Sequence, residues 1–79
     1  MALDYYAEAR LIIDALSREG FAAEANALQE AIEGGSTGSE ILMALRWRLT
    51  QFDVENRLVA PDTQRMICGL IVELNKVLS

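Results

Sequence analysis

Glycine and proline divide this chain of 79 residues into four segments, each with a helical spacing of apolar residues. Gly20, the pair Gly34-Gly35 and Pro61 stand at the breaks, and residues of these types commonly end helices. No segment shows the alternating hydropathy of a strand. The sequence therefore predicts an all-α fold, a compact four-helix bundle that forms one domain over residues 1–79. Its predicted helices lie near residues 2–19, 22–33, 38–53 and 62–78.

The ends of the first two predicted helices indicate how they are joined. With Gly20 at the C′ position, Leu16 and Phe21 have the spacing of the apolar contact in a Schellman ending. The linker is so short that the two helices should form an antiparallel or sharply crossed hairpin. At the other break, Pro61 biases Ala60 towards extended geometry, and Asp62 or Thr63 is expected to open the fourth helix.

Helical spacing also predicts which residues face the core. The predicted faces are Tyr5, Ala9, Ile12 and Leu16; Phe21, Ala25, Leu28 and Ile32; Ile41, Leu42, Leu45, Leu49 and Phe52; and Met66, Ile67, Leu70, Leu74 and Val77.

The third segment begins with the spacing of a capping box, Thr37-x-x-Glu40. A threonine hydroxyl in that position accepts from the amide of the third helical residue, whose glutamate side chain reaches back. The preceding glycines and hydroxyls could be taken for a phosphate-binding loop. However, such loops follow a strand and end in Gly-Lys-Ser/Thr, and this chain has neither feature. A helix stop followed by a helix cap explains these residues fully.

The third segment also carries apolar residues on a second side. Met43 and Trp47 lie opposite the main face, and Val54 and Leu58 join them if the helix continues that far. A helix in a small monomeric bundle needs only one apolar stripe. The second stripe has two interpretations: the bundle wraps this helix from both sides, or the stripe binds a partner.

Charge and composition restrict the classes of function. The net charge is −5, with −6 in residues 1–40 and +1 in residues 41–79, so a phosphate-neutralising nucleic-acid binder is not expected. No apolar run approaches the roughly 20 residues of a membrane helix, and residues 1–10 lack a basic secretory leader. A lone cysteine suits a reducing compartment. A cytoplasmic protein with no membrane association is the expectation.

Few residues are suited to catalysis or metal binding. The chain contains no histidine, which removes the Ser-His-Asp, Cys-His and Cys/His zinc arrangements. Cys68 is interpreted as a small inert hydrophobe at the edge of the apolar face of the fourth helix. The carboxylate pairs Asp4/Glu8 and Glu30/Glu33 are interpreted as solvated helix faces. No enzymatic activity, cofactor or metal is therefore predicted.

Residues 34–49, GGSTGSEILMALRWRL, resemble a stretch of small, uncharacterised bacterial all-helical proteins. The resemblance covers about a fifth of the chain and consists of a glycine stop, a cap and a helix. It implies an all-helical fold and no particular activity. By class analogy, some small acidic helical proteins of this kind act as immunity or regulatory partners.

The predicted function is protein–protein interaction, first of all as a homodimer that pairs through the third helix. Tryptophan, methionine and arginine are enriched at interfaces. The first alternative is an immunity-type or regulatory protein that masks a basic partner with its acidic first two helices. An enzyme or metal-binding protein built on carboxylates is the second alternative and is not expected. The predicted interface residues are Met43, Arg46, Trp47, Arg48 and Val54.

Overall fold

The computed structural model describes residues 4–55 and 59–79 and confirms the all-α prediction. No strand occurs in these two stretches. Leu58, the predicted extension of the second stripe, lies outside the described residues. The helices are α1 (Tyr5–Arg18), α2 (Ala22–Gly34), α3 (Gly38–Glu55) and α4 (Pro61–Leu78).

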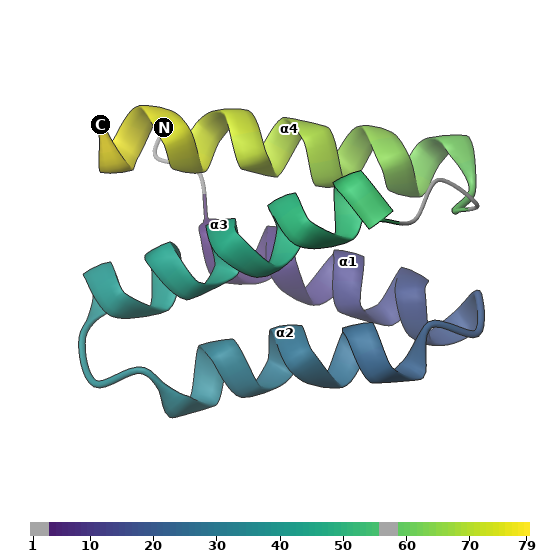
Figure 1. Cartoon of the computed structure of the whole chain (residues 1–79), viewed down its shortest axis with the longest axis horizontal. Helices are drawn as coiled ribbons and strands as arrows, with labels where there is room; N and C mark the ends of the chain where they lie inside the picture. Colours follow the sequence, from purple (N-terminus) through teal and green to yellow (C-terminus); the bar gives the residue numbers. More distant parts are fainter. Residues whose placement is uncertain (1–3, 56–58) are drawn as a thin grey trace.

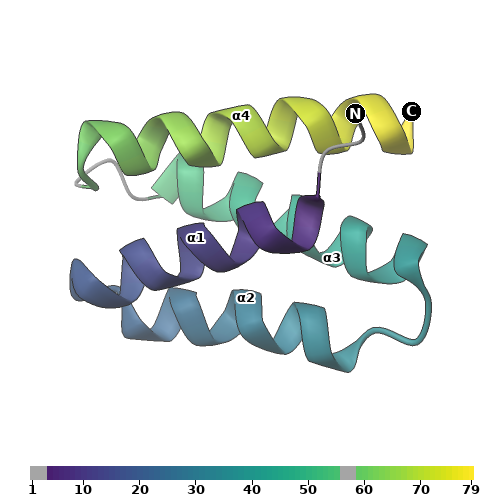
Figure 2. The ribbon, with the colours of Figure 1, turned by 180° about the vertical axis from the view of Figure 1, so that it is seen from behind.

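The four helices pack as neighbours around a square, in the order α1, α2, α3, α4 (Figure 1). The view from behind shows α1 in front and α3 at the back, so these two helices occupy opposite sides of the bundle (Figure 2). The bundle measures 30 × 23 × 22 Å. One side of α3 therefore faces the core, and the opposite side has no helix of the same bundle beyond it.

The core forms where the four predicted apolar faces meet. Its fully buried large side chains are Ile12, Leu16, Leu45, Leu49, Ile67 and Leu74. Phe21, beside the turn between α1 and α2, packs edge-on against Phe52 of α3 with ring centroids 5.4 Å apart. One predicted core residue is wrong: Val77, in the last turn of α4, is exposed.

Local contacts fix both ends of α1. Asp4, predicted only as one of a carboxylate pair, is the N-cap, and its side chain accepts from the Ala7 amide at 3.1 Å. At the C-terminal end, Gly20 has a φ of 89°, and the Phe21 amide donates to the Leu16 carbonyl at 2.8 Å. This 6→1 hydrogen bond and the positive φ of Gly20 define the predicted Schellman ending.

The predicted cap of α3 is present, with one difference. Thr37 Oγ1 accepts from the Glu40 amide at 3.2 Å, whereas the Glu40 carboxylate reaches back to the Ser36 amide instead of the Thr37 amide. Gly35 fits against the first turn of the helix, because a Cβ at this position would overlap with the side chain of Ile41. The turn before α3 therefore requires the capping side chain of Thr37 and also a glycine, without a side chain, at position 35.

Removing the α3 cap should destabilise the fold modestly. Thr37→Ala deletes the acceptor for one orphan amide and is expected to lower the free energy of unfolding by about 0.5–2 kcal/mol. Ser36→Ala is the matched control, because the contact of Ser36 uses only its backbone amide. Urea unfolding of both variants measures the difference. A larger effect for Ser36→Ala than for Thr37→Ala would place the cap one residue earlier.

The start of α4 corrects the sequence prediction. The helix begins at Pro61 and not at Asp62 or Thr63, because the fixed φ of proline suits the first helical position. Ala60 has no side chain to act as a cap, and its backbone is extended as predicted. The cap comes from the end of α1: Glu19 accepts from the Ala60 amide at 2.7 Å and from the buried Thr63 hydroxyl at 2.5 Å.

This contact predicts an acid-sensitive step in stability. The Thr63 and Ala60 hydrogen bonds hold the pKa of Glu19 below its ordinary value of 4.5. The stabilisation is thus complete above that value and is lost as the pH falls through the lowered pKa of the folded state. Glu19→Gln should be less stable than the wild type at neutral pH, and the difference should shrink in acid. Unfolding curves recorded from neutral to acidic pH measure the difference in stability between the two proteins. Glu30→Gln, which changes an exposed glutamate, is the control. Parallel acid limbs for wild type and Glu19→Gln would contradict the assignment.

Candidate functional site

The outward side of α3 carries the largest exposed hydrophobic side chains of that helix. Met43 is 52% exposed, Trp47 56% and Val54 67%. The same helix buries Leu45 and Leu49 completely on its inner side. The interpretation in which both faces of α3 are core is therefore wrong for these three residues, and the stripe lies on the surface.

The two predicted arginines lie on either side of Trp47. The Arg48 guanidinium stacks over the indole ring, 5.0 Å from its centroid, as a cation–π pair. Arg46 points towards α4 and donates to Asn75 Oδ1 at a long distance of 3.5 Å. The described residues form three ion pairs, and neither arginine belongs to them. Each guanidinium therefore retains donors for another molecule.

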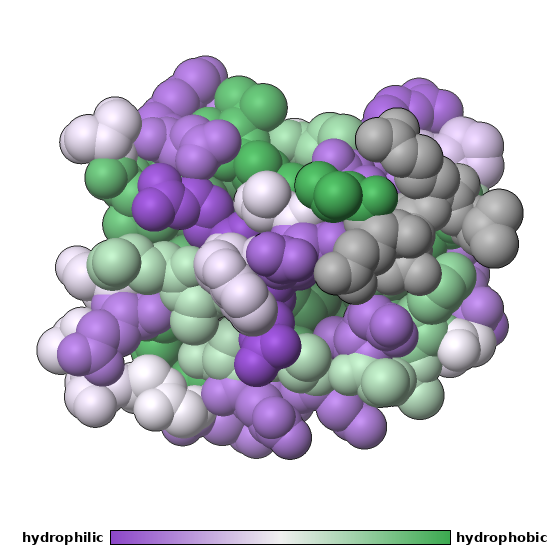
Figure 3. Space-filling model, viewed as in Figure 1, coloured by the Kyte–Doolittle hydropathy of each residue, from purple (hydrophilic) through white to green (hydrophobic). Residues whose placement is uncertain are grey.

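The space-filling view of this side of the molecule shows hydrophobic and hydrophilic side chains interspersed over α3 (Figure 3). A shallow groove of about 550 Å³ runs between α3 and α4. Such a mixture of aromatic, methionine and arginine side chains is typical of the centre of a protein interface. The groove is lined by Met43, Arg46, Trp47, Thr50, Ile71 and Asn75.

All five predicted interface residues belong to α3, but the structure adds residues that the sequence did not indicate. Thr50 lies one turn after Trp47 and lines the groove, which its spacing could have shown. Ile71 and Asn75 come from α4, and no local signal in the sequence connects them with α3. Their contribution depends on how the two helices pack.

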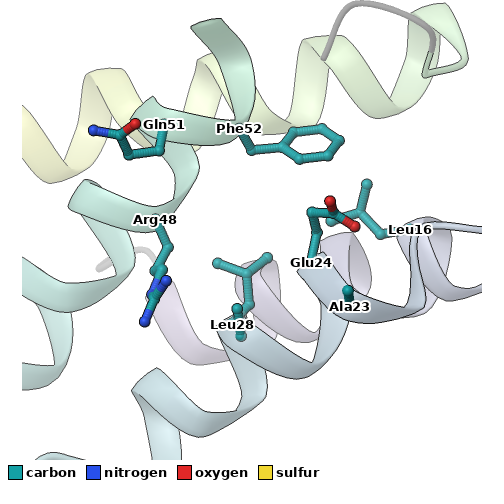
Figure 4. A pocket seen from close by; sticks show the side chains of 8 residues that line it. Leu16, Ala23, Glu24, Leu28, Arg48, Gln51 and Phe52 are labelled. Carbon is teal, nitrogen blue, oxygen red and sulfur yellow. The ribbon is translucent and has the colours of Figure 1, made fainter. Parts of the chain in front are cut away.

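A second concavity lies between α2 and α3 (Figure 4). Leu16, Leu28 and Phe52 give it an apolar floor, while Glu24 stands on one wall and Arg48 on the other. Its volume is about 230 Å³, which is below the usual size of small-molecule pockets, roughly 300–1,000 Å³. We therefore give more weight to the outer face of α3.

The remaining reactive side chains occupy structural positions. Cys68 is exposed, which corrects its interpretation as a small hydrophobe at the edge of the apolar face. Its sulfur lies 3.4 Å from Gln64 Nε2 and 3.8 Å from Asp53 Oδ1, so it takes part in a polar contact between α3 and α4. In residues 4–55 and 59–79, no three cysteine or carboxylate side chains gather as a metal site would require.

None of the described helices is both long and apolar enough to cross a membrane. No protein-family model matches the chain, and no curated protein or solved structure is significantly similar to it.

Proposed function

We propose that this chain is a protein–protein interaction module that associates with itself through the outer face of α3. The observation that carries the proposal is the exposure of Met43 and Trp47 on one side of a helix whose other side is fully buried. Apolar side chains that gather on one exposed face of a soluble protein are a typical mark of a protein–protein interaction site. Burial of the same face on two molecules removes both patches from water at once.

Small size gives a second reason for self-association. A domain of this length buries only about 60–65% of the surface of its unfolded chain, and the single cysteine cannot form an internal disulfide. Small domains offset a thin core by dense helix packing or by association. Pairing through α3 would add apolar burial where the bundle has none.

The distribution of acids supports this function over the masking of a basic partner. Residues 1–40 contain eight carboxylates, and five of them accept a hydrogen bond or form an ion pair within the same molecule. Most carboxylates in this half of the chain thus make contacts within the molecule, which accounts for their presence without a basic partner. The five are Asp4, Asp14, Glu19, Glu33 and Glu40.

The test is the molecular mass in solution as a function of concentration. The chain has a mass of 8.7 kDa, and we expect the weight-average mass to rise to twice that value at micromolar concentration. Trp47 is the sole tryptophan, so its emission should shift to the blue in the dimer and return to the red on dilution. A mass of 8.7 kDa at every concentration, with emission that does not change, would contradict the proposal.

A further inference from the structure

The exposed side chains along the outside of α3 follow a coiled-coil spacing. Met43, Trp47, Thr50 and Val54 are separated by four, three and four residues, as the a and d positions of heptads are. All four are exposed. We refer to these four residues as the seam. The seam covers about 16 Å of helix, which is short for a coiled coil and consistent with weak, micromolar pairing.

The one polar member of the seam is compatible with burial. The Thr50 hydroxyl donates to the Arg46 carbonyl of its own helix at 2.7 Å. Its donor is therefore already satisfied, and its methyl group is free to contact a partner. A buried hydroxyl without such a bond would cost about 1–3 kcal/mol.

The intervals between the seam residues are four, three and four, so the order is the same in both directions along the helix. Such a symmetric spacing suits a two-fold axis. When a second α3 is laid antiparallel on the first, Met43 meets Val54 of the second copy and Trp47 meets Thr50. Each layer then sets a longer side chain against a smaller one, the complementarity that dense packing requires. The two-fold axis generates each of these two contacts a second time, so the pair has four layers.

The charges beside the seam complement each other in the same arrangement. Arg46 and Asp53 occupy the flank nearest α4, where they contact Asn75 and Gln64 respectively. In an antiparallel pair the equivalent flanks face each other, so Arg46 lies next to Asp53 of the second copy, twice by symmetry. The opposite flank carries the uncharged Ala44 and Gln51, and Arg48 lies beside them with its guanidinium over Trp47. In the antiparallel pair Arg48 lies nearest to Arg48 of the second copy, so this flank gains no ion pair. In a parallel pair, Arg46 would face Gln51 and gain no ion pair.

On the strength of the self-association proposed above, we infer that the occupant of the α3 face is the α3 helix of a second copy, antiparallel about a two-fold axis. Trp47 packs on Thr50, Met43 packs on Val54, and Arg46 pairs with Asp53. In Figure 1, α3 lies in front of α1, with α4 above it and α2 below it, so its outer side points away from the bundle. The two-fold axis sets α4 beside α4 and α2 beside α2.

Disulfide cross-linking tests this register. In a Cys68→Ser background, Met43→Cys and Val54→Cys molecules are prepared separately and then mixed with oxidised glutathione. The mixture should form a dimer disulfide at least tenfold faster than either variant alone. In the proposed register, positions 43 and 54 of different copies are adjacent, whereas the two copies of position 43 are about 16 Å apart. Cross-linking of Met43→Cys with itself as fast as in the mixture would overturn the antiparallel arrangement.

The other outcomes separate this inference from the proposed function. A dimeric mass with no cross-link in any combination would overturn the seam but leave self-association intact. A monomeric mass of the wild type, together with no cross-link, would overturn both.

Reversing the charges of Arg46 and Asp53 tests the pairing on the flank nearest α4 and requires no cysteines. Arg46→Asp alone sets carboxylates against each other, and Asp53→Arg alone sets guanidinium groups against each other. Each variant should dimerise about threefold to tenfold more weakly than the wild type. An equal mixture should recover wild-type affinity, because both pairs are then opposite in sign. Melting curves of each variant verify that the monomer is folded. Equal weakening in the mixture would overturn the Arg46–Asp53 pairing.

Discussion

Leu49→Ala is expected to lower the free energy of unfolding by about 2–5 kcal/mol, which is the largest effect of any single substitution proposed for this chain. Leu49 lies on the inner side of α3 and is completely buried. Its truncation removes apolar contacts within the core cluster and leaves a cavity that a small bundle can close only partly. A chain of 79 residues has a total stability on the order of 4–12 kcal/mol. The variant should therefore be partly unfolded at physiological temperature.

Circular dichroism during thermal and urea unfolding measures this effect. Leu11→Ala is the matched control, since the same substitution is made on α1 at a side chain that is 55% exposed. The control should remain within about 0.5 kcal/mol of the wild type. A cost for Leu49→Ala as small as that of the control would mean that the inner side of α3 does not pack against the core.

Trp47→Ala should have the second largest effect, on association and not on folding. Trp47 is two residues from Leu49 but lies on the outer side of the same helix. Truncation of a central tryptophan anchor commonly costs 2 kcal/mol or more of binding free energy, about a 30-fold weaker dimer. The cation–π contact with Arg48 is lost as well, but it lies on the surface and contributes little to the monomer.

The two α3 variants thus separate two properties of one helix. Leu49→Ala should weaken the fold, whereas Trp47→Ala should give a monomer that melts close to the wild-type monomer. If Trp47→Ala instead unfolded the chain, the outer side of α3 would belong to the core of a single molecule.

Most helix ends are predictable from the sequence because their determinants are local. Gly20 ends α1 through its positive φ, and Thr37 caps α3 through a bond to a residue three positions away. The start of α4 is different, because its cap is Glu19, which lies 41 residues before Ala60. A contact of that separation exists only once the helices have packed, so no motif in the sequence announces it.

The candidate site was likewise predictable only where its determinants lie within one helix. Helical spacing places Met43, Trp47 and Val54 on one side of α3, but it does not say whether another helix covers that side. The same limit explains Val77, which lies on the apolar side of α4 yet remains exposed in the last turn. The contribution of Ile71 to the groove depends on the packing of α4 against α3, which no periodicity within either helix determines.

Sedimentation equilibrium of the wild type, Trp47→Ala and Leu11→Ala, from nanomolar to high micromolar concentration, tests the central claim most directly. The claim is that the outer face of α3 is the surface through which this chain associates. Trp47 and Leu11 are almost equally exposed, on helices at opposite sides of the bundle. We expect the wild type and Leu11→Ala to rise together from 8.7 kDa to twice that mass, while Trp47→Ala remains near 8.7 kDa. Identical mass curves for all three proteins, whether monomeric or dimeric, would contradict the claim.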